Sequence, residues 1–248
     1  MNTLTDRFQR PLRDLRISVT DRCNFRCIYC MPKEIFGANY PFLQRDEVLT
    51  FEEIERIAGI FAANGVRTLR ITGGEPLLRR YIEDLVARLA AIPGIDDIAM
   101  TTNGSLLTAK KARALKDAGL NRITISLDSL DDAVFKAMND VNFPVAKVLQ
   151  AIDNAVAAGL EPVKIDTVVK RGVNDHTIVQ LAGYFRHTGI IPRFIEFMDV
   201  GSTNGWRMED VVSAREILEA IRGEWAIEPV KPNYFGEVAA RYRYLHGG

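Results

Sequence analysis

Residues 15–30 read LRISVTDRCNFRCIYC, and they join a run of alternating apolar and polar residues to three closely spaced cysteines. The run at 15–20 has the period of two that is typical of a β-strand. Cys23, Cys27 and Cys30 follow it, and they are the only cysteines among the 248 residues. A strand that leads into a loop with three thiols is therefore the starting point for interpreting the rest of the chain.

The CxxxCxxC spacing favours an iron–sulfur cluster that lacks a fourth protein ligand. Cluster-binding thiolates usually come in fours, so three of them leave one iron open to a small molecule. An odd number of cysteines in one loop does not make a disulfide framework. Structural zinc needs four ligands, and the three histidines lie far away in the sequence. Buried inert cysteines are usually scattered singly on apolar faces, whereas these are interleaved with Arg22, Asn24 and Arg26.

The composition indicates an ordinary globular chain, one large domain or a domain and a half. Its 32 basic and 32 acidic residues give no electrostatic footprint for nucleic acid or for an anionic membrane. No stretch approaches the ~20 apolar residues of a membrane span, and the first residues lack the pattern of a secretory signal. We therefore expect a cytoplasmic protein with neither a nucleic-acid partner nor a membrane partner.

Strand patterns alternate with amphipathic helical patterns along the whole chain. Six such units with right-handed crossovers predict an α/β fold, a partial (βα)6 TIM-type barrel of parallel strands. The expected strands are 15–20, 68–73, 97–103, 122–128, 163–169 and 193–198. Three helices are expected to end at a glycine before a strand, at Gly65, Gly119 and Gly159. The expected helix starts are the capping boxes Thr50 with Glu53 and Ser213 with Glu216, and the N-cap Thr108.

One face of the predicted sheet is polar in five successive strands, although parallel strands covered on both faces should be apolar throughout. Burying such groups unpaired costs about 1–3 kcal/mol each, so we expect a polar cavity; a sheet with one solvated face is the alternative. Three cations on this face suit an anionic substrate, unless they pair with Asp128 or Asp166. The polar residues are Arg16, Ser18, Thr20, Arg70, Thr72, Thr101, Asn103, Thr124, Ser126, Asp128, Lys164 and Asp166.

Polar loops follow the first four strands, at the carboxyl ends where sites form in this architecture. The second strand ends in Gly73-Gly74-Glu75-Pro76, in which the glycines let the backbone approach a ligand closely and Glu75 can accept a hydrogen bond from an amine. A lone methionine such as Met198, at the end of the sixth strand, is more often a core residue than a ligand contact, but its parity matches that of Glu196, toward the cavity. The chain contains no GxxxxGK[ST], GxGxxG, HExxH or GxSxG motif, which disfavours a P-loop, a dinucleotide site and hydrolysis.

The cysteine motif, the Gly-Gly-Glu-Pro turn and the six βα units together resemble the radical S-adenosylmethionine (radical SAM) superfamily. Five segments are similar in sequence to one family within it, the GTP 3′,8-cyclases of molybdenum cofactor biosynthesis. These segments are 12–23, 31–34, 69–77, 193–199 and 234–238. The resemblance runs from about residue 10 to the last residues. It implies the radical SAM fold, with 1–200 as the partial barrel and 201–248 as the start of a C-terminal covering region.

The resemblance also implies the cofactors and their ligands. Cys23, Cys27 and Cys30 would hold a [4Fe–4S] cluster whose open iron is chelated by SAM. The implied SAM-binding residues are Tyr29, Gly74, Glu75, Ser126 and Met198. The implied GTP-binding residues are Arg16, Arg70, Thr101 and Lys164.

The implied reaction is reductive cleavage of SAM to methionine and a 5′-deoxyadenosyl radical, which removes a hydrogen atom from the GTP ribose. C3′ then bonds to C8 of guanine and gives (8S)-3′,8-cyclo-7,8-dihydroguanosine 5′-triphosphate. The resemblance further implies GTP as substrate, an external electron donor, cyclic pyranopterin monophosphate synthase as the downstream enzyme, and a homodimer.

Family members carry a second cysteine cluster in their C-terminal region, whereas this sequence has no cysteine after Cys30. We therefore expect a chain that is truncated at the C-terminus, holds one cluster where full-length relatives hold two, and cleaves SAM poorly or without coupling to GTP. Three alternatives stay open: another radical SAM activity, a catalytically dead fragment that binds only the first cluster and SAM, and zinc binding by the cysteines.

Overall fold

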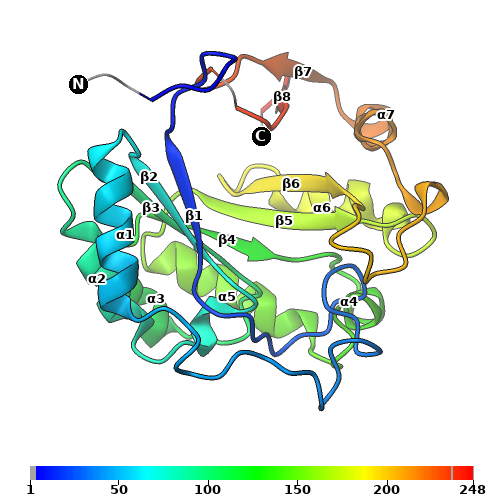
Figure 1. Ribbon diagram of the computed structural model, residues 1–248. Coiled ribbons are helices and arrows are strands. Elements are labelled where there is room, and N and C mark those ends of the chain that lie inside the picture. The colour runs from blue at the N-terminus through cyan, green and yellow to red at the C-terminus, as the bar shows by residue number, and fades with distance from the viewer. Residues whose placement is uncertain (1–3, 236, 248) are drawn as a thin grey trace. The chain divides into compact units, whose positions relative to one another are not determined.

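The computed structural model describes residues 4–235 and 237–247. Residues 1–3 of the N-terminal segment, Gly236 within the stretch 234–238, and Gly248 lie outside the described residues. Figure 1 shows the order of helices and strands along the chain.

All six predicted strands are present, and they form one sheet in the order β1-β2-β3-β4-β5-β6. The pairs β1–β2, β2–β3, β3–β4 and β5–β6 are parallel. The strand at 163–169 has the predicted bounds, while the sixth begins and ends two residues earlier than predicted. The strands are β1 (Asp14–Ser18), β2 (Thr68–Thr72), β3 (Asp97–Thr102), β4 (Arg122–Ser126), β5 (Val163–Val169) and β6 (Ile191–Glu196).

Helices connect successive strands, and their ends follow local sequence chemistry. Both predicted capping boxes are confirmed, and so is the N-cap at Thr108. The predicted glycine stops have φ values of 106° at Gly65 and Gly119 and 75° at Gly159, the left-handed region that glycine tolerates best. The helices are α1 (Phe51–Ala63), α2 (Ile82–Ala90), α3 (Ala109–Asp117), α4 (Asp132–Asn139), α5 (Val145–Ala157), α6 (Ile178–Phe185) and α7 (Ala214–Glu224).

The structure also contains short elements that the sequence patterns did not predict. Three are single 3₁₀ turns, η1 (Pro76–Leu78), η2 (Asp175–Thr177) and η3 (Met208–Asp210). Two strands form an antiparallel hairpin, β7 (Ile227–Val230) and β8 (Arg241–Tyr244). None of the helices in the described part of the chain is long and apolar enough to cross a membrane.

The tertiary contacts divide the described residues into two units. Unit 1 contains the residues up to Phe25, together with Phe36–Ser126 and Ala146–Val163. Unit 2 contains Arg26–Ile35, Leu127–Val145 and the residues from Lys164 onward. The predicted division at residue 200 stays a prediction.

The core of unit 1 consists of the apolar side chains at alternate positions of its strands, together with the helices that cover them. Strand register places like side chains together, with Leu15 beside Leu69 and Ile17 beside Ile71. Leu69 and Ile71 are fully buried, and α1, α2 and α3 lie side by side near the strands in Figure 1. Burying one such side chain contributes about 1.5–3 kcal/mol. The apolar side chains therefore stay on the covered face of the sheet, and the residues between them point to the opposite face. The polar parity predicted for these strands is therefore confirmed, while the polar cavity stays a prediction.

Unit 2 has its own core, built where α6, α7 and the hairpin meet the end of β5. Trp225 and Tyr244 pack against this core with their rings 5.8 Å apart, in an edge-to-face arrangement. Gly183 of α6 lies under Trp225, and a Cβ added there would stand 2.8 Å from the indole. The buried members are Val169, Ile178, Ala182, Val212, Ile217 and Ile221.

Candidate active site

The backbone of the turn after β2 forms hydrogen bonds with the segment that leads to the first cysteine. Gly74 N–H donates to the carbonyl of Thr20 at 2.7 Å, and Glu75 N–H donates to the carbonyl of Arg22 at 2.8 Å. A Cβ added to Gly74 would stand 2.2 Å from the Arg22 carbonyl oxygen and 2.9 Å from the Cys23 nitrogen. Only glycine allows this approach, so the motif fixes the backbone immediately before Cys23.

Glu75 is fully buried, and its carboxylate links the turn after β2 to the end of β3. One carboxylate oxygen accepts from Leu77 N–H at 2.9 Å and from the Thr102 hydroxyl at 2.7 Å. The other accepts from Asn103 N–H at 2.7 Å. Burial raises the pKa of Glu75, while the N–H donors of Asn103 and Leu77 lower it. A contact between Glu75 and the amino group of SAM stays a prediction.

The first cysteine, Cys23, belongs to unit 1 and is half-buried. Its sulfur accepts from Phe25 N–H at 3.4 Å. The side-chain amide of Asn103 also points at it, with Nδ2 3.9 Å from Sγ. The same nitrogen donates to Asn24 Oδ1 at 2.9 Å. The sulfur is thus surrounded by N–H donors from within its own unit.

Cys27 and Cys30 belong to unit 2, where a single turn holds them. Cys30 N–H and Met31 N–H both donate to the Cys27 carbonyl, at 2.9 and 3.0 Å. The turn is bonded to the carboxyl end of α4, because Ile28 N–H donates to the Met138 carbonyl at 3.1 Å. Cys27 is half-buried and Cys30 is exposed, and none of the three cysteines is in a disulfide.

Tyr29, between these two cysteines, is anchored to a buried carboxylate. Its hydroxyl donates to Asp128 Oδ2 at 3.0 Å, and Val168 N–H donates to Asp128 Oδ1 at 3.0 Å. Burial raises the pKa of Asp128 to about 7, against these two hydrogen bonds, which lower it. Burial and the negative charge of Asp128 raise the pKa of Tyr29 well above its usual value. The pair therefore holds the cysteine turn through the ring of Tyr29.

Sequence reasoning missed Asn204, which connects the cysteine turn to the end of β6. Its Nδ2 donates to the carbonyls of Tyr29 and Met198, both at 2.9 Å. Asn204 is 8% exposed, and its Oδ1 is buried without a hydrogen-bond partner among the described residues. The side chain of Met198 itself is 52% exposed. The only sequence signal for Asn204 is its place in the polar loop after the sixth strand.

Two of the predicted substrate-binding arginines are neighbours in the sheet of unit 1. Arg16 of β1 and Arg70 of β2 are register partners, so their side chains leave the same face of adjacent strands. Arg70 Nη2 is 3.4 Å from Asp14 Oδ1, but its Nε is buried without a partner among the described residues. The structure gives Arg16 no ion pair within the described part of the chain. Like charges side by side destabilise a sheet, so an anion on this face would relieve their repulsion.

The remaining predicted site residues lie on strands at half-buried positions. Thr101 is in β3 and Ser126 ends β4, both in unit 1, and Lys164 follows the start of β5 in unit 2. The acids that were alternative partners for the cations each have a described contact, and their pairing with the cations stays an alternative. Asp166 Oδ1 is 2.6 Å from the Arg193 guanidinium, and Asp128 binds Tyr29.

The three thiols are the donors that an iron–sulfur cluster needs. Among the residues that the structure describes, no group of three or more His, Cys, Asp or Glu side chains could hold a metal ion. A four-iron cluster gives each cysteine its own iron atom, and the chain supplies three thiols without a disulfide. At Gly74 the backbone of Arg22 takes the place that a side chain would need, so the glycine fixes the chain just before the first of these cysteines.

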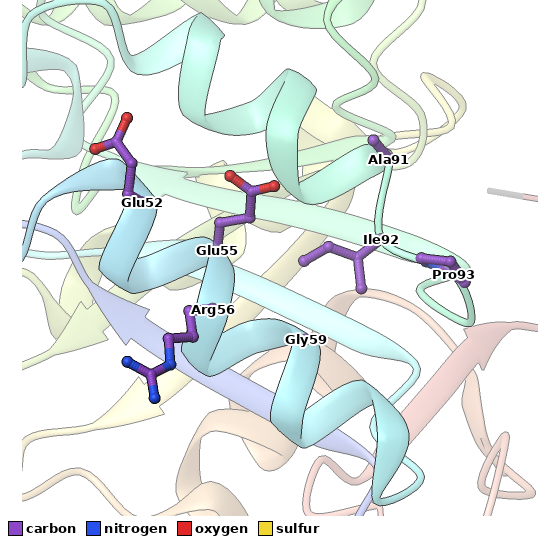
Figure 2. Close-up of a pocket in the computed structure, with 7 residues that line it drawn as sticks. All are labelled: Glu52, Glu55, Arg56, Gly59, Ala91, Ile92 and Pro93. Carbon is purple, nitrogen blue, oxygen red and sulfur yellow. The ribbon is translucent and has the colours of Figure 1, made fainter.

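A groove of about 430 Å³ lies elsewhere in unit 1, on helices instead of strand ends (Figure 2). Glu52 and Glu55 of α1, which help to line it, pair with Arg88 of α2 at 2.7 and 2.9 Å. None of the candidate site residues lines this groove. Its residues are Glu52, Glu55, Arg56, Gly59, Ala91, Ile92 and Pro93.

Comparisons with known proteins identify the superfamily and the fold. The family model of the radical SAM superfamily matches residues 17–185. The solved structure of SuiB from Streptococcus suis bound to S-adenosylmethionine has a TM-score of 0.67 at 19% identity, covering 84% of this chain and 46% of that one. The structure of anSMEcpe with bound AdoMet has a TM-score of 0.66 at 18% identity, covering 87% and 58%. The chain belongs to the radical SAM superfamily, and its fold is the α/β partial barrel of that superfamily.

Sequence relatives identify the branch of the superfamily. The GTP 3′,8-cyclase of Acidothermus cellulolyticus is 57% identical over 98% of this chain and 67% of the relative. The GTP 3′,8-cyclase of Staphylococcus haemolyticus is 54% identical over 99% of this chain and 72% of the relative. Within the radical SAM superfamily, the family is therefore that of the GTP 3′,8-cyclases.

Proposed function

We propose that this chain is a radical SAM enzyme that cyclises GTP to the 3′,8-cyclic nucleotide of molybdenum cofactor biosynthesis. In this proposal Cys23, Cys27 and Cys30 hold one [4Fe–4S] cluster. The observation that carries it is the backbone pairing of Gly74 and Glu75 with the segment before Cys23. A glycine turn whose backbone is bonded to the segment before the first of three thiols, none of them in a disulfide, has a clear purpose if a small molecule binds beside that thiol.

The residues proposed to bind SAM are Tyr29, Gly74, Glu75, Ser126 and Met198. When bound, the cluster supplies an electron that cleaves SAM to methionine and the 5′-deoxyadenosyl radical. The chain's own residues have positioning roles. Gly74 lets the backbone of Arg22 pack closely against the turn before Cys23, and buried Glu75 keeps the turn in place through Thr102 and Asn103. Asn204 holds the backbone of Tyr29 against that of Met198.

The residues proposed to bind GTP are Arg16, Arg70, Thr101 and Lys164. Arginine forms paired hydrogen bonds with phosphate oxygens, so adjacent arginines suit a triphosphate. The register of Arg16 with Arg70, and the buried Arg70 Nε that has no partner among the described residues, support this assignment. The same family membership supports cyclic pyranopterin monophosphate synthase as the enzyme that consumes the product.

The electron requirement implies an external one-electron donor, since the cleavage of SAM consumes one electron and the radical left after C3′–C8 bond formation takes a second electron and a proton. We further propose a cytoplasmic location and a homodimer, both carried over from the family. Three cysteines suffice for one cluster, and we propose a single cluster in this chain.

The test is anaerobic reconstitution with iron and sulfide, followed by turnover with dithionite, SAM and GTP. We expect about four irons per chain, release of 5′-deoxyadenosine, and a GTP-dependent cyclic product detected by mass spectrometry. A colourless chain that binds one zinc, or a loaded chain that releases no 5′-deoxyadenosine, would contradict the proposal. Hydrogen abstraction from a molecule other than GTP would support a different radical SAM activity.

The GTP assignment has a separate test in Arg70→Ala. We expect the variant to bind GTP at least about tenfold more weakly, because losing a charge-assisted hydrogen bond costs about 1.5–3 kcal/mol. Its iron content should match that of the unmodified chain. Arg122→Ala is the matched control, because Arg122 of β4 already pairs with Asp97. An unchanged affinity for GTP in Arg70→Ala would remove Arg70 from the site.

A further inference from the structure

The orientation of the Asn103 amide is determined by its hydrogen bonds. Its Oδ1 accepts from Ser105 N–H at 2.9 Å and from the Ser105 hydroxyl at 2.6 Å. A backbone N–H can only donate, so the atom that faces it must be the oxygen. The amide nitrogen therefore lies on the other side, toward Asn24 Oδ1 at 2.9 Å and Cys23 Sγ at 3.9 Å.

The amide is also held rigidly in place. Asn103 is 9% exposed, and its own N–H donates to the fully buried carboxylate of Glu75 at 2.7 Å. Asn24 Nδ2 donates to the Ser105 hydroxyl at 2.8 Å, which closes a ring of hydrogen bonds through Asn24, Ser105 and Asn103. With one amide hydrogen used by Asn24, the second remains for the sulfur of Cys23.

We propose that Asn103 is a positioning and tuning residue that donates an N–H···S hydrogen bond to Cys23 and raises the reduction potential of the cluster. Hydrogen bonds to the cysteine sulfurs are among the factors that set cluster potentials. The reduced cluster carries one more negative charge than the oxidised one, so a donor on its sulfur stabilises the reduced form more. The inference rests on the proposed function, because it needs a cluster on Cys23.

The test is an EPR-monitored redox titration of the reconstituted full chain without SAM, in which dithionite supplies one electron per cluster. We expect Asn103→Ala to lower the equilibrium constant for reduction about threefold to tenfold; tenfold is about 59 mV for a one-electron couple. Asn103→Asp replaces the N–H donor by a negatively charged oxygen and should lower the equilibrium constant for reduction further. Ser105→Ala is the matched control, because it removes a hydroxyl from the same network and leaves the amide donor. Its equilibrium constant should stay within about twofold of the unmodified chain.

A measurement on the unmodified chain keeps the test valid if the variants fail to hold iron. Asparagine labelled with ¹⁵N in the side-chain amide should show a nuclear coupling to the reduced cluster, because the N–H···S bond passes spin density to Nδ2. The absence of that coupling, or an unchanged potential in Asn103→Ala, overturns the inference and leaves the proposed function standing. An unmodified chain that takes up no iron overturns both, so the two failures are distinguishable.

Discussion

The close approach of two backbones defines this site at the scale of single residues. Gly74 and Glu75 act as a short extra pairing partner for Thr20 and Arg22, beyond the end of β1. The pairing requires that residue 74 carry no Cβ, because the carbonyl of Arg22 occupies that space. The position of Cys23 thus depends on a hydrogen atom at a residue 51 positions away in the sequence.

Gly74→Ala should displace the Arg22 carbonyl and disturb the backbone at Cys23. We expect the variant to be destabilised by about 1–3 kcal/mol and to retain less iron after reconstitution, as measured by urea unfolding and iron analysis. Gly59→Ala is the control, because a Cβ at Gly59 in α1 meets nothing within 4 Å. That control should gain about 0.5–1 kcal/mol. Equal iron content in both variants would show that the glycine has no role at the cysteine loop.

Tyr29→Phe removes the hydroxyl donor of a buried carboxylate. Asp128 is 2% exposed, so it should be left short of one hydrogen bond at a cost of about 1–3 kcal/mol. Tyr184→Phe is the control, because Tyr184 is 53% exposed and surface changes usually stay within about 0.5 kcal/mol. Unfolding in urea would measure both variants. Equal stabilities would mean that the Tyr29 hydroxyl does not anchor the cysteine turn.

At the scale of elements, periodicity and end signals predicted the strands and the caps well, because both are local. Five of the six predicted strands extend one or two residues too far at their carboxyl ends, whereas β5 has the predicted bounds. The strand predicted at 122–128 ends at Ser126, although Leu127 N–H still donates to the carbonyl of Asp166 in β5 at 2.9 Å. Asp128 keeps the predicted polar parity, yet its partner is a tyrosine and not a cation. A period of two says which face a side chain takes, but not which group it meets there.

Glu216, in the capping box of helix α7, should make the stability of the chain depend on pH. The Ser213 hydroxyl and N–H, together with Arg171, lower the pKa of Glu216 to about 2. A lowered carboxylate pKa contributes stability above the unfolded value of 4.5, and this contribution is lost as the pH falls toward 2. Glu216→Gln should therefore melt at a lower temperature than the unmodified chain at pH 7, and the gap should narrow steadily below pH 4.5. A gap that is constant with pH would mean that the charge of Glu216 is not what stabilises the cap.

At the scale of the whole molecule, the contacts that sequence patterns could not reveal are those between distant segments. Asn204 donates to a carbonyl 175 positions earlier, and no local period records such a pairing. The hairpin of β7 and β8 was missed because its strands are short and interrupted by Pro229. The cysteine loop could be predicted because its three cysteines are close in sequence. The polar face of the strands could be predicted because it follows a period of two within each strand.

The last prediction concerns the stability of the whole chain on binding SAM. A ligand at a hundredfold excess over its Kd stabilises the folded state by about 2.7 kcal/mol, which for a chain of this size corresponds to about 5–10 °C in Tm. We expect that shift when SAM is added anaerobically to the reconstituted chain, since the open iron is the main anchor of SAM in the proposed site. Cys30→Ser removes one cluster ligand from an exposed position and should abolish the shift while barely changing the Tm of the iron-free chain. If SAM raised the Tm of Cys30→Ser as much as that of the loaded chain, it would bind without the cluster. The three thiols would then need a different explanation.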